Sequence, residues 1–294
     1  MLYLKRGKTL NIINTYPYLL SSYDDGRFDL KKWETYIDTC VPGARQLCVD
    51  DMNEVINAGY SFEKDFLPVL NAVYHDSDSR EKVIRFFQIV TEGLEDKIIN
   101  RFGKTTDTDI ILYLGLCNGA GWVTKVNGKT VVLSGIEKIM ELKWDDIDSM
   151  NGLILHELGH VYQSQYGILH RDFDSLPDHF LWQLFTEGIA MVFEQEILND
   201  PGYYHQDVSG WKDWCDQNAD LIRRSFYEDL NKMTKEDQRY FGDWASFEGH
   251  GDTGYYLGVR FVRFLLEEDD FDHLIRYGIR EVKDGFERFM SAEI

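Results

Sequence analysis

Apolar residues recur at helical spacing over much of the first hundred positions. Between Val83 and Ile98 they return every three or four residues, and Gly103 closes the run. Asp29 is a suitable N-cap for a shorter helix, and Gly59 is a suitable C-terminal glycine for another. We therefore expect the first part of the chain to be mainly helical.

The pattern changes from helical to extended after Gly103. Residues 109–114 form a short apolar, β-branched run that predicts a strand. Two further β-rich runs, residues 122–126 and 129–133, flank an Asn-Gly pair. Such a pair predicts a hairpin, because both residues tolerate positive φ.

The helical period returns at Asp146 and continues, interrupted by loops, towards the C-terminus. The fold class expected is therefore α+β, mostly helical, with a small antiparallel or mixed sheet upstream of the later helices. We expect a mainly helical N-terminal subdomain over residues 1–104 and a second domain over residues 105–294. No linker-like composition marks the boundary near residue 104, so we treat it as a subdomain change, where predicted helices give way to predicted strands.

Charge and composition narrow the classes of partner. The 294 residues include 51 acidic and 31 basic ones, a formal net charge of −20. A surface this negative repels phosphate backbones and anionic lipids, which argues against nucleic-acid and membrane partners. No run of about 18 apolar residues exists, and the N-terminal stretch is too polar for a signal peptide. We therefore expect a cytoplasmic protein.

The sequence H-E-L-G-H at residues 156–160 is an H-E-x-x-H motif. Its apolar flanks predict a helix, which Asp148 or Ser149 would cap. On a helix His156 and His160 lie one turn apart on the same side, so both can bind one ion at about 2.0–2.1 Å. Glu157 lies where a general base would face the water on that ion. Coordination would also offset the cost of burying these polar groups.

A catalytic zinc site needs a third protein ligand and an open fourth position. The longer pattern H-E-x-x-H-x-x-G-x-x-H does not apply, because Gln163 and Tyr166 occupy its glycine and last histidine positions. His170 is the next histidine, but it lies in a predicted loop and does not match that spacing, and His179 and Asp174 are also weak choices.

Glu187 is the preferred third ligand. It lies in a helix predicted from Pro177 to about Leu198, where its many apolar neighbours mean that a carboxylate needs a partner. The small residues Gly188 and Ala190 would let this helix approach the H-E-x-x-H helix closely. The sequence therefore predicts a two-helix site for one Zn²⁺ ion.

With these residues the chain resembles the gluzincins, zinc peptidases that pair an H-E-x-x-H helix with a glutamate on a later helix. More narrowly, it resembles a family of predicted zinc-dependent proteases of uncharacterised substrate. The shared features are H-E-x-x-H, E-G-x-A at 187–190 and a glycine-tyrosine element, G-Y-Y-L-G, at 254–258. The resemblance covers roughly residues 109–268 and implies a zincin-like fold.

The resemblance also implies functional roles. His156, His160 and Glu187 would bind zinc, with Glu157 as the base, and an extended substrate would lie along an edge strand. Residues 118–121 would line the cleft. Gluzincins often carry an acidic residue four positions after the glutamate ligand, where this chain has Met191. Glu194 is about two turns from Glu187, so it could only support a ligand from behind, and the group that orients a ligand histidine is unidentified.

Peptide hydrolysis also needs a hydrogen-bond donor for the oxyanion that forms at the attacked carbonyl. Tyr255 is the first choice, because it opens the glycine-tyrosine element at a predicted helix start. Tyr256 and His250 are the rivals.

Three functions follow as hypotheses. The leading one is a zinc metallopeptidase that acts on a peptide or protein substrate. The second is a zinc hydrolase of a small amide or ester, and the third is a non-catalytic, zinc-binding regulatory protein. The sequence leaves open the substrate, endo- or exopeptidase action, the role of residues 1–104 and the oligomeric state.

Overall fold

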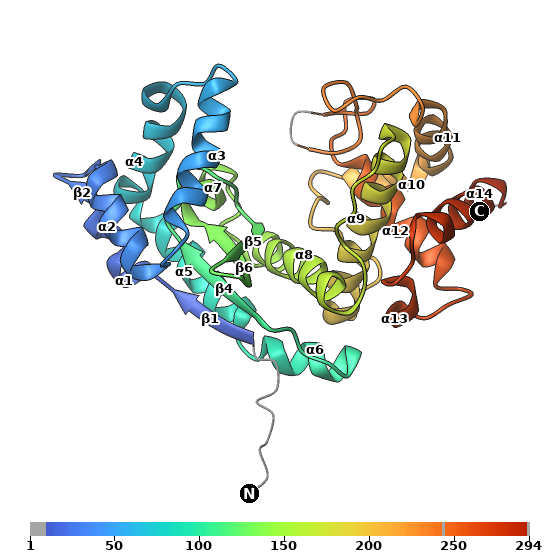
Figure 1. Cartoon of the computed structure of the whole chain (residues 1–294), viewed down its shortest axis with the longest axis horizontal. Coiled ribbons are helices and arrows are strands. Elements are labelled where there is room, and N and C mark those ends of the chain that lie inside the picture. The colour runs from blue at the N-terminus through green and yellow to red at the C-terminus, as the bar shows by residue number, and fades with distance from the viewer. Residues whose placement is uncertain (1–9, 243–244, 293–294) are drawn as a thin grey trace, which may run out of the picture. The chain divides into compact units, whose positions relative to one another are not determined.

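The protein forms two compact units, residues 1–157 and 158–294. The computed structural model describes residues 10–242 and 245–292 and is drawn in Figure 1. The boundary between the units falls inside helix α8 (Ile147–Tyr166), which is one continuous helix. The change from helices to strands near residue 104 occurs within the first unit. The expected α+β class, mostly helical with a small mixed sheet, is confirmed.

The first unit contains a four-stranded sheet in the order β1-β4-β6-β5. Its strands are β1 (Leu10–Asn14), β4 (Thr108–Tyr113), β5 (Trp122–Val126) and β6 (Lys129–Gly135). Strands β1, β4 and β6 run parallel, and β5 runs antiparallel to β6. The predicted hairpin is confirmed, with φ of 51° at Asn127 and 80° at Gly128. Strand β1 was not predicted; it pairs with β4 from Leu10 opposite Thr108.

Helices and a small hairpin make up the rest of the first unit. The helical segments are α1 (Tyr16–Leu19), the 3₁₀ turn η1 (Leu20–Ser22), α2 (Leu30–Cys40), α3 (Arg45–Asn57), the π-helical η2 (Phe62–Phe66), α4 (Leu67–His75), α5 (Ser77–Thr91), α6 (Leu94–Phe102) and α7 (Ile136–Glu141). Strands β2 (Tyr23–Asp24) and β3 (Arg27–Phe28) form a separate antiparallel pair. The single run predicted through Ile98 is two helices, because Gly93 adopts a left-handed φ of 66° between them.

Helix α2 fixes the end of strand β4. Asp29 caps this helix as predicted and accepts hydrogen bonds from two backbone N–H groups of its first turn. The buried Trp33 donates its indole N–H to the carbonyl oxygen of Leu114 at 2.9 Å. The hydroxyl of Tyr36 accepts the N–H of Leu114 at 2.9 Å. These two hydrogen bonds fix the backbone of Leu114, the residue that joins β4 to the loop that follows.

The second unit is built on a buried helix. Its helices are α9 (Leu176–Leu198), α10 (Trp211–Gln217), α11 (Ala219–Asp229), α12 (Thr253–Leu265), α13 (Phe271–Leu274) and α14 (Ile279–Ser291). Ser175 caps α9 and Pro177 lies in its first turn, as predicted. Most of α9 between Phe180 and Gln195 is buried, as a helix that is apolar on all sides requires. Helices α9 and α12 run side by side (Figure 1). Within the described ranges, no helix combines the length and apolar character needed to cross a bilayer.

Gly188→Ala is expected to destabilise the second unit. A Cβ atom at Gly188 would lie 2.3 Å from the carbonyl oxygen of Gly258 on α12. A backbone atom of a packed helix cannot move aside alone, so we expect a loss of about 1–3 kcal/mol in the free energy of unfolding. Urea unfolding followed by circular dichroism measures it. Gly251→Ala, whose Cβ would have its nearest neighbour at 3.7 Å, is the control; equal losses in both variants would contradict the close helix contact.

Candidate metal centre

Helix α8 presents the H-E-x-x-H residues. The prediction that Asp148 or Ser149 caps this helix is wrong, because the helix already begins at Ile147 and both residues lie in its first turn. Oδ1 of Asp146 instead accepts the N–H groups of Asp148 at 2.9 Å and Ser149 at 3.0 Å. This side chain satisfies two of the donors that every helix leaves open at its start.

His160 and Glu187 meet where helices α8 and α9 approach each other. A Cβ atom on Gly159 would lie 2.7 Å from the Cα of Ala190, so the two backbones are nearly in contact. Nε2 of His160 lies 3.3 Å from Oε2 of Glu187, and the two side chains are 15% and 16% exposed. The sequence predicted this approach through Gly188 and Ala190. Ala190 makes it, whereas Gly188 faces α12.

His156, His160 and Glu187 form a group with metal-binding geometry. Each offers one ligand atom, and these atoms all lie within 4.8 Å of one another. His156 and Glu157 belong to the same continuous helix as His160, although the unit boundary follows Glu157. A tetrahedral ion with bonds of about 2.0–2.1 Å holds its ligand atoms roughly 3.4 Å apart. The 3.3 Å between Nε2 of His160 and Oε2 of Glu187 fits that spacing.

The weaker ligand choices do not join this group. Across residues 10–242 and 245–292, neither His170, Asp174 nor His179 belongs to a group of three metal-binding side chains. Burial lowers the pKa of His179, with a further contribution from the positive charge of Lys235. The residues in this group, two imidazoles and one carboxylate, are the ones that the sequence predicted as ligands, and they lie close enough together to hold a metal ion.

A second group shares His156 with the first. The ligand atoms of His156, Glu194 and His205 also lie within 4.8 Å of one another. Glu194 is fully buried, and its Oε2 lies 3.0 Å from Nδ1 of His205. The sequence pointed to Glu194 but not to His205, because His205 lies in the loop after α9 and has no characteristic spacing. The signal that was present is a glutamate inside an apolar helix, which requires a polar partner.

Glu157 borders the loop between β4 and β5. A Cβ atom on Gly121 would lie 2.7 Å from Oε1 and 2.8 Å from Cγ of Glu157. A side chain at position 121 would therefore have to displace the carboxylate of Glu157 from its place beside the loop. The sequence expected residues 118–121 to line the cleft, and the last of them lies against the expected general base.

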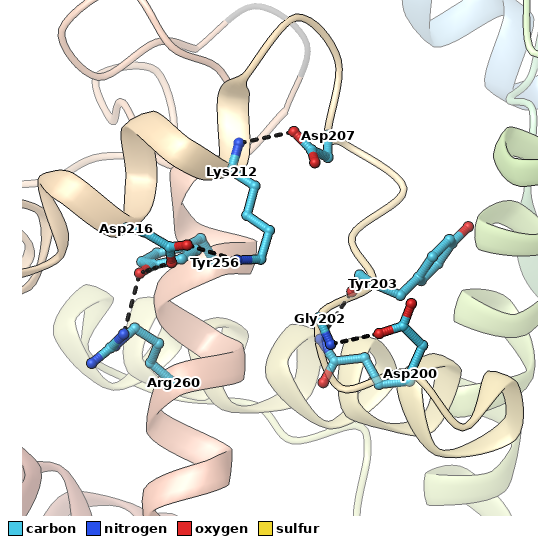
Figure 2. A network of polar contacts seen from close by, with 9 residues as sticks. Asp200, Gly202, Tyr203, Asp207, Lys212, Asp216, Tyr256 and Arg260 are labelled. Carbon is cyan, nitrogen blue, oxygen red and sulfur yellow. Dashed lines mark hydrogen bonds and ion pairs between the residues drawn. The ribbon is translucent and has the colours of Figure 1, made fainter.

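Tyr256, a rival oxyanion donor, belongs to a separate polar network. Its side chain is 1% exposed, and its hydroxyl donates to Oδ1 of Asp216 at 2.9 Å. Arg260 donates to the same hydroxyl at 3.3 Å, and Lys212 bonds Asp216 at 2.6 Å (Figure 2). Burial, together with the bond to Asp216, raises the pKa of the Tyr256 hydroxyl. The hydroxyl of Tyr256 is therefore engaged by Asp216 and Arg260, and we assign this tyrosine a structural role in α12.

Tyr255 and His250 differ from Tyr256 in their surroundings. The ring of His250 stacks on that of Trp214, with centroids 3.8 Å apart. Tyr255 lies in the first turn of α12, as the sequence predicted, and is half-buried. Its ring contacts Phe241 edge-on, with centroids 5.7 Å apart. The choice of Tyr255 over His250 as oxyanion donor stays a prediction.

The sequence analysis missed one buried acid, Glu137 on helix α7. Its side chain is 0% exposed, although glutamate is rarely buried without partners. Burial raises its pKa from 4.5 to about 7, against the opposing effect of backbone N–H donors from Gly115 and Cys117. The carboxylate therefore titrates near neutral pH.

The stability of the protein is expected to depend on pH through Glu137. Between pH 4.5 and about 7 the folded chain keeps a proton on this group that the unfolded chain has lost. The free energy of unfolding should therefore fall as pH rises through that window and then level off, by roughly 3 kcal/mol in total. Urea unfolding at pH 5 and pH 8, compared between wild type and Glu137→Gln, isolates this contribution. A difference between the two proteins that is the same at both pH values would contradict it.

Comparison with models of protein families, with curated proteins and with solved structures finds no match to this chain. The resemblance to gluzincins rests on the three motifs at residues 156–160, 187–190 and 254–258.

Proposed function

We propose that this protein is a zinc-dependent metallopeptidase. The observation that carries the proposal is the 3.3 Å approach of His160 Nε2 to Glu187 Oε2, with His156 in the same group of ligand atoms. A helix pair that brings two imidazoles and a carboxylate together, with Glu157 next to His156 in the motif as the base, supports hydrolysis.

The residues of the chain have distinct roles in the proposed reaction. When bound, a zinc ion supplies a Lewis acid that polarises the scissile carbonyl and lowers the pKa of its water ligand. Glu157 accepts a proton from the attacking water and passes it to the leaving nitrogen. The hydroxyl of Tyr255 donates a hydrogen bond to the oxyanion that forms at the carbonyl.

Glu194 is proposed as the orienting partner that the sequence left unidentified. An imidazole has two ring nitrogens, so His156 can offer one to the ion and the other to a carboxylate. The buried Glu194 belongs with His156 in the second group and is itself 3.0 Å from His205. A carboxylate there fixes the orientation of the ring and raises its basicity as a ligand.

A peptide is the substrate class that the sheet supports best. In the order β1-β4-β6-β5, strand β5 stands at one end of the sheet, and it starts directly after Gly121. Gly121 lies against Glu157. An extended peptide that adds to a sheet edge gains backbone hydrogen bonds, and here it would lead to the general base.

A peptide library tests this proposal. Purified protein is stripped with a chelator, reloaded with zinc and incubated with proteome-derived peptides, and mass spectrometry identifies new termini. We expect new termini with the zinc-loaded protein, none after chelation, and their return when zinc is added back. A zinc-loaded protein that leaves every peptide intact would refute peptidase action and favour a small amide or ester as substrate.

A further inference from the structure

The buried carboxylate of Glu137 accepts hydrogen bonds from two backbone N–H groups in the loop after β4, those of Gly115 and Cys117. Its Oε2 accepts the N–H of Gly115 at 3.0 Å, and its Oε1 accepts the N–H of Cys117 at 3.1 Å. In the part of the chain that the structure describes, the pairing of β4 with β6 ends at Tyr113, before these two donors. A carboxylate held by several backbone N–H groups resembles the concave anion sites that turns form. Here the bound anion is a side chain of the same unit.

The conformation of the loop requires such support. Cys117 adopts a left-handed φ of 61°, which costs energy for a residue with a Cβ and persists only where neighbours enforce it. Between the two donors to Glu137, the N–H of Leu116 is bound by Oδ1 of Asn118 at 2.9 Å. The amide of Asn118 in turn donates to the carbonyl oxygen of Cys48 on α3 at 2.9 Å. Side chains, rather than a strand ladder, therefore hold the loop.

The loop is also packed against the start of helix α7. A Cβ atom on Gly115 would lie 2.6 Å from Oε1 of Glu137, and one on Gly135 would lie 2.5 Å from the carbonyl oxygen of Gly119. The N–H of Gly135 donates to the carbonyl oxygen of Ala120 at 3.1 Å. The loop and the carboxylate therefore fit together without spare room, and a shift of one moves the other.

The far end of the loop lies against the general base of the proposed reaction. An ideal Cβ atom on Gly121 would come within 3 Å of the Glu157 side chain, as described above, so the two residues are in close contact. Glu137 thus holds one end of the loop, at Gly115 and Cys117, and the backbone of residues 118–120 joins that end to Gly121 beside Glu157. We infer that Glu137 is a positioning residue, which holds the loop of residues 115–121 in place beside Glu157. The expected effect on catalysis rests on the proposed function, whereas the effect of Glu137 on the loop does not.

Glu137→Gln tests the inference, with Glu141→Gln as the matched control on the same helix. Glutamine keeps the shape of Glu137 but turns an N–H₂ group towards one of the two backbone donors. Glu141 is exposed and pairs with Lys138, so its replacement leaves the loop intact. Hydrogen exchange by mass spectrometry, zinc content and peptide hydrolysis per bound zinc are measured on full-length wild type and both variants.

We expect exchange across residues 115–121 to be about tenfold faster in Glu137→Gln and unchanged in Glu141→Gln. Zinc content should be the same in all three proteins, and kcat per bound zinc should fall about tenfold in Glu137→Gln alone. A variant that was only less stable would lose folded protein but keep kcat per bound zinc. Unchanged loop exchange, or a looser loop with unchanged kcat per zinc, would overturn the positioning role.

Two further results separate this inference from the proposed function. If wild type cleaves no peptide, the proposed function fails, whereas loop exchange still decides whether Glu137 holds the loop. If Glu137→Gln does not fold, residue-resolved exchange by NMR on wild type decides instead. The N–H groups of Gly115 and Cys117 should then be strongly protected, and exchange at the rate of a free peptide would overturn the inference.

Discussion

Glu157→Gln is expected to lower kcat/KM for peptide hydrolysis by about 10²–10⁴-fold and to leave one zinc ion per chain. Glutamine fills the same volume beside Gly121 but cannot take a proton from water. The loss corresponds to roughly 3–5 kcal/mol of transition-state stabilisation, the scale of one positioned general base. Steady-state hydrolysis of a cleaved library peptide and elemental analysis of the same sample measure both quantities.

Asp148→Asn is the matched control for this experiment, because it removes one negative charge from the first turn of the same helix. It should leave kcat/KM within about twofold of wild type. Full activity of Glu157→Gln, or loss of its zinc, would contradict the assignment of Glu157 as a base that does not bind the metal.

Glu187→Gln is expected to weaken zinc binding more than His205→Ala does. Glutamine at 187 replaces a charged ligand oxygen 3.3 Å from His160. His205 contacts Glu194 at 3.0 Å, so its removal disturbs only an outer partner of His156 and should cost about 10–100-fold in affinity. Competition with a zinc chelator of known affinity measures both losses, and hydrolysis at limiting zinc should follow the same order.

The comparison also separates the two groups that share His156. If zinc were held by His156, Glu194 and His205, then His205→Ala would abolish binding and Glu187→Gln would have the smaller effect. That order would overturn the assignment of Glu187. His160→Ala adds an independent check, since His160 belongs to one group only.

The sequence predicted the elements that carry the site because local signals agree there. The motif lies in a helix with apolar flanks, and Ser175 and Pro177 start the helix that carries Glu187. The Asn-Gly pair gave the hairpin for the same reason, since a two-residue turn depends on those residues alone. Local signals also set the limits of the prediction: Gly93 was read as part of a helix, although it separates two.

Features that depend on contacts between distant residues could not be predicted. Strand β1 is defined by its parallel pairing with β4, nearly a hundred residues later, and not by its own short pattern. The pair of Glu194 and His205 and the bonds of Glu137 to the loop are contacts of this kind. The small residues of α9 were recognised, but only the packing decides that Ala190 faces α8 while Gly188 faces α12.

The most direct test of the central claim is anomalous diffraction at the zinc edge from crystals of the zinc-loaded protein. The account predicts a single strong peak per chain, bonded to His156, His160 and Glu187 at about 2.0–2.2 Å, with Glu157 outside bonding distance. A peak bonded to Glu194 and His205 instead, or no peak after incubation with zinc at neutral pH, would contradict it.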